Sequence, residues 1–170
     1  MLGKLSRRNA KRQAKDYIIY FITVTISAAL MFSFNSLATS KDISELSISM
    51  KDFSKVINII SILIVIIMAW LINYTMKFML EKRSKEFGTY QLLGIEKKDI
   101  ANMYTLENII IGIFAFIIGV FGGIFLYQIF TSIIMNIFDQ PYGIQITFNI
   151  DALKTTAIYF FRYIYTSIIK

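Results

Sequence analysis

The residues that could carry chemistry in this chain are concentrated in one charged segment, Lys77–Glu107. It holds six Lys or Arg and five Asp or Glu residues, and it lies between two long apolar runs. The chain has no cysteine and no histidine, so these residues cannot build a disulfide, a thiolate nucleophile, a histidine-based triad or an ordinary zinc site. The segment is therefore better interpreted as a docking surface than as a catalytic centre.

The remaining carboxylates do not favour catalysis either. Asp139 and Asp151 stand twelve positions apart with no third ligand near them in the sequence. There is no Gly-rich phosphate loop, and no pair of carboxylates is spaced for acid–base work. We expect no enzyme activity, no metal and no cofactor.

The rest of the sequence is apolar enough to define the fold class. The chain is 56% hydrophobic and 15% aromatic, and apolar runs of about 20 residues predict membrane helices. Little polar sequence is left to cover a soluble core. We predict an all-α integral membrane protein with four transmembrane helices, and a helical hairpin at residues 77–107 between the second and third. The predicted spans are residues 17–37, 56–78, 108–137 and 152–169.

The distribution of positive charge predicts the orientation, because an excess of Lys and Arg marks cytoplasmic loops. Residues 1–16 carry six of them against one acid, and the charged segment 77–107 carries another six. The loop 38–55 carries three and the loop 138–151 none. We therefore expect a multi-pass protein of the plasma membrane with both termini and the hairpin in the cytoplasm. The net charge of +7 is then mostly topological, and no nucleic-acid partner is expected.

The basic segment 1–16 has two interpretations that the sequence leaves open. The apolar run behind it is too long for a secretory signal and lacks a small-residue cleavage site, so we expect an uncleaved first span. The segment itself could form a short interfacial helix on anionic headgroups. It could equally be an unstructured positive tail.

Local signals predict that the hairpin is helical on both sides of a turn. Opposite charges four residues apart, as in Glu81 and Lys85, support a helix that continues from the second span. Gly94 is suited to the position that ends this helix. A second helix is expected to start near Glu96, with Asp99 favourable in its first turn.

The third span contains four glycines that could form a helix-packing seam. Two small residues four positions apart allow close approach of helix backbones in lipid, where association depends on packing. Glycine is also simply common in membrane helices, so the alternative is that these residues carry no packing role. Their density within one span favours the seam, whose candidates are Gly112, Gly119, Gly122 and Gly123.

The charged segment also resembles a known family. The run from Lys82 to Gly94 reads Lys-Arg-Ser-Lys-Glu-Phe-Gly-Thr-Tyr-Gln-Leu-Leu-Gly, and it resembles the basic pair, Lys/Arg-Glu-Phe-Gly and following Leu-Gly of FtsX-like ABC transporter permeases. The similarity continues through Ile100, Glu107-Asn108 and the third span. The opening, Leu5–Arg12, is similar to the Leu-x-x-Arg-Asn-x-x-Arg start of the branch that handles bacitracin and other peptide antibiotics.

This resemblance implies a permease subunit that serves antimicrobial-peptide resistance or export and couples to a separate cytoplasmic ATPase, on which ATP is hydrolysed. It implies a coupling surface at the matching positions, which are Lys82, Arg83, Lys85, Glu86, Phe87, Gly88, Leu93 and Gly94. An alternative for the hairpin is a positive-inside loop without a partner. For Phe87 in particular, a role in partner binding competes with simple packing inside the hairpin.

The chain departs from the family in length, since permeases of this branch carry further spans and a large extracellular domain. Arg162 also interrupts the fourth apolar run, where a charge costs about 2.5–3.5 kcal/mol on insertion scales. We therefore expect an N-terminal portion of a permease, in which Arg162 faces helices outside this chain. Expected partners are membrane lipid, the ATPase, and either the rest of a split permease or a second permease copy. The alternative functions are a non-transporting mechanotransmission scaffold of the same wider family and an inactive truncated remnant.

Overall fold

The computed structural model describes residues 2–40, 53–139 and 149–169, with side chains placed for 17–40, 53, 55–139 and 149–166. The chain forms helix α1 (Leu2–Ala38), helix α3 (Phe53–Leu92), helix α4 (Lys97–Ile137) and helix α5 (Ile150–Ile169). No strand occurs among the described residues, and the predicted all-α fold is confirmed. The two loops predicted to face outward lie mostly outside these residues.

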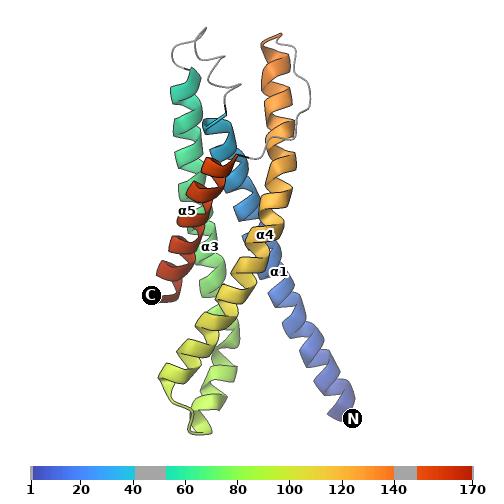
Figure 1. The fold of residues 1–170 in the computed structure, drawn as a ribbon. Coiled ribbons are helices and arrows are strands. Elements are labelled where there is room, and N and C mark those ends of the chain that lie inside the picture. Colours follow the sequence, from blue (N-terminus) through green and yellow to red (C-terminus); the bar gives the residue numbers. More distant parts are fainter. Residues whose placement is uncertain (1, 41–52, 140–148, 170) are drawn as a thin grey trace.

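Three of these helices are much longer than a membrane is thick. At a rise of 1.5 Å per residue, a helix of 40 residues extends about 60 Å, twice the ~30 Å hydrocarbon layer. Both α3 and α4 therefore continue out of the apolar region as one hairpin. Figure 1 shows the turn of this hairpin at the same end of the molecule as the N-terminal part of α1.

The membrane-spanning signal differs between the predicted spans. Within the described residues, three helices are long and apolar enough to cross a membrane, namely α1 from Tyr17 onward, α3 and α4. The fourth predicted span forms α5, which is helical as expected but is not one of those three. Its crossing of the membrane stays a prediction. Arg162 lies on the exposed side of this helix.

The basic N-terminal segment is neither a separate interfacial helix nor an unstructured tail. Residues 2–16 continue without a break into the first span as the start of α1. The physical reason is local, because the segment contains no proline and is rich in Ala, Leu, Lys, Arg and Gln, which favour helix. A separate interfacial helix would need a bend near Asp16.

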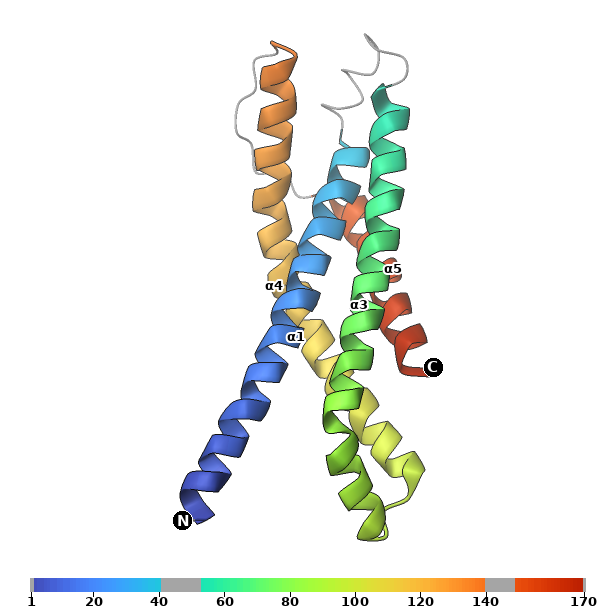
Figure 2. The ribbon, with the colours of Figure 1, turned by 180° about the vertical axis from the view of Figure 1, so that it is seen from behind.

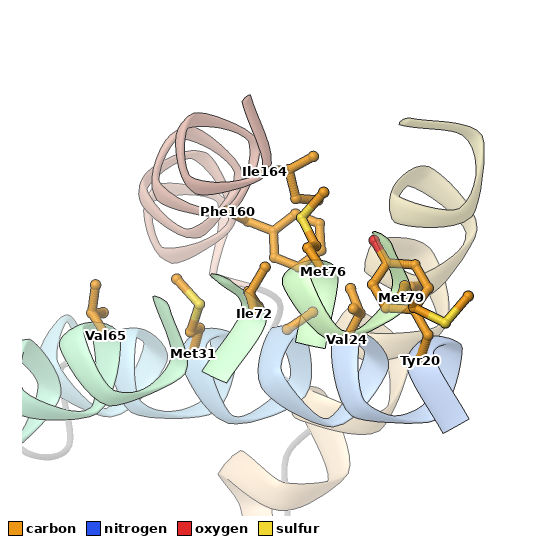
Figure 3. Packing of buried hydrophobic residues seen from close by; sticks show 11 residues of the cluster. Tyr20, Val24, Met31, Val65, Ile72, Met76, Met79, Phe160 and Ile164 are labelled. Atoms are coloured by element: carbon orange, nitrogen blue, oxygen red, sulfur yellow. The ribbon is translucent and has the colours of Figure 1, made fainter. Parts of the chain in front are cut away.

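Helix α1 lies at the centre of the bundle and packs against each of the other three helices, most extensively against α4. Figure 2 shows α3 running beside α1, with α5 behind α3. Large buried side chains from three helices meet in the main core, among them Tyr20 and Met31 of α1, Ile72 and Met76 of α3, and Phe160 of α5 (Figure 3). The outer faces of the long helices carry exposed Ile, Phe and Trp side chains, as expected of surfaces in contact with lipid.

A buried polar network holds α1, α3 and α5 together. The side-chain amide of Asn35 donates to the hydroxyl of Thr156 at 2.9 Å, and Ser61 donates to the amide oxygen of Asn35 at 3.0 Å. All three residues are buried. Hydrogen bonds of this kind between membrane helices contribute about 0.6–2 kcal/mol each. This network was not predicted from the sequence, although a polar residue inside each of three apolar runs is a usable signal.

The glycines of α4 differ in what they contact. A Cβ atom added at Gly119 would lie 2.6 Å from Cβ of Ala28 and 2.8 Å from the carbonyl oxygen of Thr25. One added at Gly123 would lie 2.8 Å from the carbonyl oxygen of Ala29. At these two positions the backbones of α1 and α4 are therefore in direct contact, which only glycine permits.

The other two glycines lie outside this contact. Gly112 faces α5, where an added Cβ would meet only the end of the Ile164 side chain, at 2.9 Å. Gly122 is exposed, and its nearest neighbour to an added Cβ would be the Ala29 methyl group at 3.9 Å, an ordinary contact distance. The seam that the structure describes is therefore formed by Gly119 and Gly123 against α1.

We predict that Gly119→Ala lowers the stability of the bundle by about 1–3 kcal/mol, the usual cost of overpacking a tight contact. Gly122→Ala is the matched control, because it adds the same methyl group on the same helix where there is room. Thermal unfolding in detergent, followed by circular dichroism, measures both. Equal melting temperatures for the two variants would show that α1 and α4 do not touch at Gly119.

Candidate functional site

The turn of the hairpin is set by one glycine. Gly94 has a φ of +89°, a conformation that other residues adopt only with strain. Its N–H bonds to the carbonyl of Gln91 at 3.0 Å, and the N–H of Ile95 bonds to the carbonyl of Tyr90 at 3.1 Å. This pair of bonds is the Schellman motif, which satisfies the last carbonyl groups of a helix. The prediction that Gly94 ends the first arm is confirmed.

The second arm begins near Glu96, as predicted. Glu96 has an extended backbone (φ −64°, ψ 143°) and occupies the N-cap position, and α4 starts at Lys97. Asp99 lies in the first turn, where its negative charge is favourable at the positive end of the helix dipole. A short, fully bonded turn therefore connects two helices that each continue into the apolar region.

The two arms are held together by a small apolar core made of Phe87, Ile100 and Tyr104. The rings of Phe87 and Tyr104 meet edge to face with centroids 5.8 Å apart, a geometry worth about 0.5–1.5 kcal/mol beyond the area buried. The hydroxyl of Tyr104 donates to the backbone carbonyl of Met76 at 3.0 Å. These contacts give the hairpin a defined shape rather than that of a flexible loop.

The burial of Phe87 bears on the two roles considered for it, partner binding and packing inside the hairpin. This side chain is only 8% exposed and packs against Ile100 and Tyr104 of α4. The structure favours packing within the hairpin, the alternative that competes with its place on the coupling surface. A single sequence cannot separate these roles, because an apolar residue in a charged segment is expected in both.

A charged cluster connects the hairpin to α1. Its members are Arg83 and Glu86 on α3, Glu107 on α4 and Tyr17 on α1, and we call it the Arg83 cluster. Arg83 Nε lies 3.1 Å from Glu86 Oε2, and its Nη1 pairs with Glu107. The Tyr17 hydroxyl donates to the same Glu107 carboxylate. The Arg83 guanidinium also lies over the Tyr17 ring, 5.5 Å from its centroid, and 5.1 Å from that of Phe87.

In this arrangement the positive charge of Arg83 is balanced by the carboxylates of Glu86 and Glu107, and it also lies over the rings of Tyr17 and Phe87. The Arg83 side chain is only 15% exposed, so its charge is partly removed from water and depends on these partners. Arg83 and Glu86, both predicted to lie on the coupling surface, bond to each other within this cluster and are partly buried, and their contact with a partner stays a prediction. The sequence did not predict that Tyr17 belongs to this cluster or that Glu107 connects it to α1. The two residues are 90 positions apart, and a contact over that distance leaves no periodic signal in one sequence.

The remaining candidates form the outer surface of the hairpin. Lys82, Lys85, Gly88, Leu93 and Gly94 are all exposed. At the turn, Leu92 is 90% exposed, Leu93 74% and Ile95 42%. We call these three apolar residues the tip surface. Large apolar side chains that are so exposed, outside the long apolar runs, are typical of a binding surface.

Comparison with known protein families assigns most of the chain to one family. Residues 58–168, which include the hairpin, α4 and most of α5, match the family described as FtsX-like permease C-terminal. The chain belongs to the FtsX-like permease family. It is therefore a multi-pass membrane protein, as the helices indicate.

Individual relatives extend the match toward the N-terminus. The chain is 31% identical over 94% of its length to the bacitracin export permease protein BceB of Bacillus subtilis, and 26% identical over the same share to the protein of that name from Halalkalibacterium halodurans. It is 25% identical over 78% of its length to the uncharacterized ABC transporter permease YvcS of Bacillus subtilis. The chain spans about a quarter of the length of these relatives, since it covers 24%, 24% and 21% of them.

We predict that Arg83→Gln lowers the free energy of unfolding by about 1–2 kcal/mol, because Glu86 and Glu107 both lose their ion pair with Arg83. This cost is below the ~3–5 kcal/mol of a fully buried pair, since Glu86 and Glu107 are 30% and 32% exposed. Lys85→Gln is the control, with the same charge change at an exposed site. Thermal unfolding in detergent measures both variants.

A double-mutant cycle makes this test specific. If the pair carries the effect, combining Arg83→Gln with Glu107→Gln costs less than the sum of the single variants. Additive effects, or equal effects of Arg83→Gln and Lys85→Gln, would contradict the cluster.

Proposed function

We propose that this chain is the membrane-spanning portion of an ABC transporter permease that serves resistance to peptide antibiotics, and that its hairpin docks on a separate cytoplasmic ATPase. The observation that supports the substrate class most directly is the similarity to two bacitracin export permeases over 94% of the chain. No catalytic step is assigned to the chain itself, so ATP binding and hydrolysis would take place on the partner.

The proposed orientation places the hairpin and both termini in the cytoplasm. It is supported by the six Lys and Arg residues in each of the segments 1–16 and 77–107, against none in 138–151. The hairpin turn and the N-terminal part of α1 lie at the same end of the molecule (Figure 1). This arrangement agrees with the charge distribution, because it puts both basic segments on the same side of the membrane.

Contact with the ATPase would be made by the outside of the hairpin. The tip surface supplies exposed apolar side chains, and Lys82 and Lys85 supply positive charge on the first arm. Apolar anchors surrounded by polar groups are how compact interfaces gain most of their affinity. The internal core of Phe87, Ile100 and Tyr104 would keep this surface in one shape.

Motion of the docked hairpin would reach the membrane through two connections. The two arms are themselves the continuations of α3 and α4, so a tilt of the hairpin moves both spans. The Arg83 cluster adds a connection to α1 through Tyr17. Since α1 packs against α3, α4 and α5, a displacement there would be passed to all the helices that the structure describes.

The docking proposal predicts that Leu93→Asp weakens co-purification with the cognate ATPase by tenfold or more, since a hot-spot residue contributes on the order of 2 kcal/mol. The melting temperature should stay unchanged because Leu93 is exposed. Phe87→Ala should instead lower the melting temperature, because it empties the core of the hairpin. Met103→Asp is the control, an exposed apolar residue on the same hairpin away from the tip. Undiminished binding by Leu93→Asp would refute docking at the tip.

The orientation is tested with single cysteines, since the chain has none of its own. We expect a cysteine at Ser84 to be protected from an impermeant maleimide in intact cells, and cysteines at Ser47 and Tyr142 to be labelled. The last two positions lie outside the described residues, in the loops predicted to face outward. Labelling at Ser84, or protection at both loop positions, would overturn the orientation.

A further inference from the structure

A groove of about 330 Å³ lies between α1, α3 and α5, on a part of the molecule that the proposed function does not use. It is bounded by α1 from Asn35 to Thr39, by α3 from Asn58 to Ile66 and by α5 from Thr155 to Tyr163. These segments lie toward the C-terminal end of α1 and the N-terminal ends of α3 and α5, away from the hairpin (Figure 1). At 1.5 Å per residue the groove extends roughly 12 Å along α3 and along α5, so it enters the apolar region from that end.

The walls of the groove are polar but uncharged. Seven of the eleven described residues that line it have a hydroxyl or amide side chain, and none of the eleven is Asp, Glu, Lys or Arg. On α5, Thr155, Tyr159 and Tyr163 follow one another at a spacing of four residues, which puts them on one face of the helix. The fourth apolar run therefore has a polar face, and the groove lies along it.

Some of these polar groups have hydrogen-bonding capacity that the protein does not use. The Asn35 amide donates one hydrogen bond and accepts one, although it has two N–H groups and two acceptor positions. The Tyr159 and Tyr163 hydroxyls make no hydrogen bond within the part of the chain that the structure describes. Hydrocarbon offers neither donors nor acceptors, so a lipid chain in this groove would leave all these groups unsatisfied at a high cost in free energy.

We propose that this groove binds water within the membrane-spanning region and is reached from the membrane surface on the side away from the hairpin. Water satisfies donors and acceptors alike, and the groove has room for several molecules at ~30 Å³ each. A charged ligand is not favoured, because no described lining residue carries an opposite charge. The proposal rests on the membrane placement of α1, α3 and α5 given in the proposed function, and it does not depend on ATPase docking.

Single cysteines test for water, because the chain has none of its own and only an ionised thiol reacts with a methanethiosulfonate. Ile62→Cys and Tyr159→Cys place the thiol in the groove. Leu63→Cys and Ile158→Cys are the controls, since they are adjacent positions at the same depth, exposed but outside the groove. Intact cells that express the full chain are treated with the impermeant methanethiosulfonate ethyltrimethylammonium. The groove cysteines should react faster on the order of tenfold, because a thiol in apolar surroundings ionises less. Equal rates at groove and control positions would overturn the proposal.

Matched double variants identify the polar wall as the cause. In the Ile62→Cys background, Thr155→Leu combined with Tyr159→Leu makes the α5 wall apolar and should slow the labelling several-fold. Tyr165→Leu combined with Thr166→Leu removes the same two kinds of hydroxyl from exposed positions outside the groove and should leave the rate as it is. Equal rates in the two double variants, whether both slowed or both unchanged, would show that the hydroxyl groups of the groove do not hold the water and would overturn the site.

The same labelling in inside-out vesicles separates the groove from the proposed orientation. If the groove cysteines react faster than their controls in vesicles but not in cells, the groove holds water and the orientation is wrong. If all four cysteines react slowly from both sides, lipid or another helix fills the groove and the proposal is overturned.

Discussion

In lipid, apolar side chains gain little by associating with each other, so membrane helices are held together by close packing and by hydrogen bonds. In this bundle the packing depends on the place where α1 and α4 meet backbone to backbone. Gly119 and Gly123 leave no room for even a Cβ atom against Thr25, Ala28 and Ala29. Helix α1 also packs against α3 and α5. The arrangement of the four described helices therefore depends on this contact.

Helix α1 is connected to its neighbours by different interactions along its length. Near one end, the Tyr17 hydroxyl bonds to the carboxylate that pairs with Arg83. In the middle, small residues contact the glycines of α4. Toward the other end, Asn35 bonds to α3 and α5 through Ser61 and Thr156. Polar bonds therefore flank an apolar contact, and α1 is held to its neighbours at three levels along its length.

The hairpin separates two kinds of residue that look alike in the sequence. Arg83 and Phe87 are largely buried and hold the hairpin together, whereas Leu92, Leu93 and Ile95 remain exposed at the turn. The buried residues give shape and the exposed residues offer a surface. The family motif contains both kinds, so a match to the motif does not by itself mark a residue as a contact with a partner.

The sequence by itself determined the features that depend on local interactions and on transfer into lipid. The long apolar runs predicted helices, Gly94 and Glu96 predicted where the two arms end and begin, and the motif from Lys82 to Gly94 predicted the family. Only the tertiary structure decided that Phe87 is buried, that Arg83 pairs with Glu107, and that Gly122 lies off the seam. Periodicity shows that residues share a face of one helix, but which neighbour covers that face depends on contacts between distant segments, such as Tyr17 with Glu107 and Asn35 with Thr156.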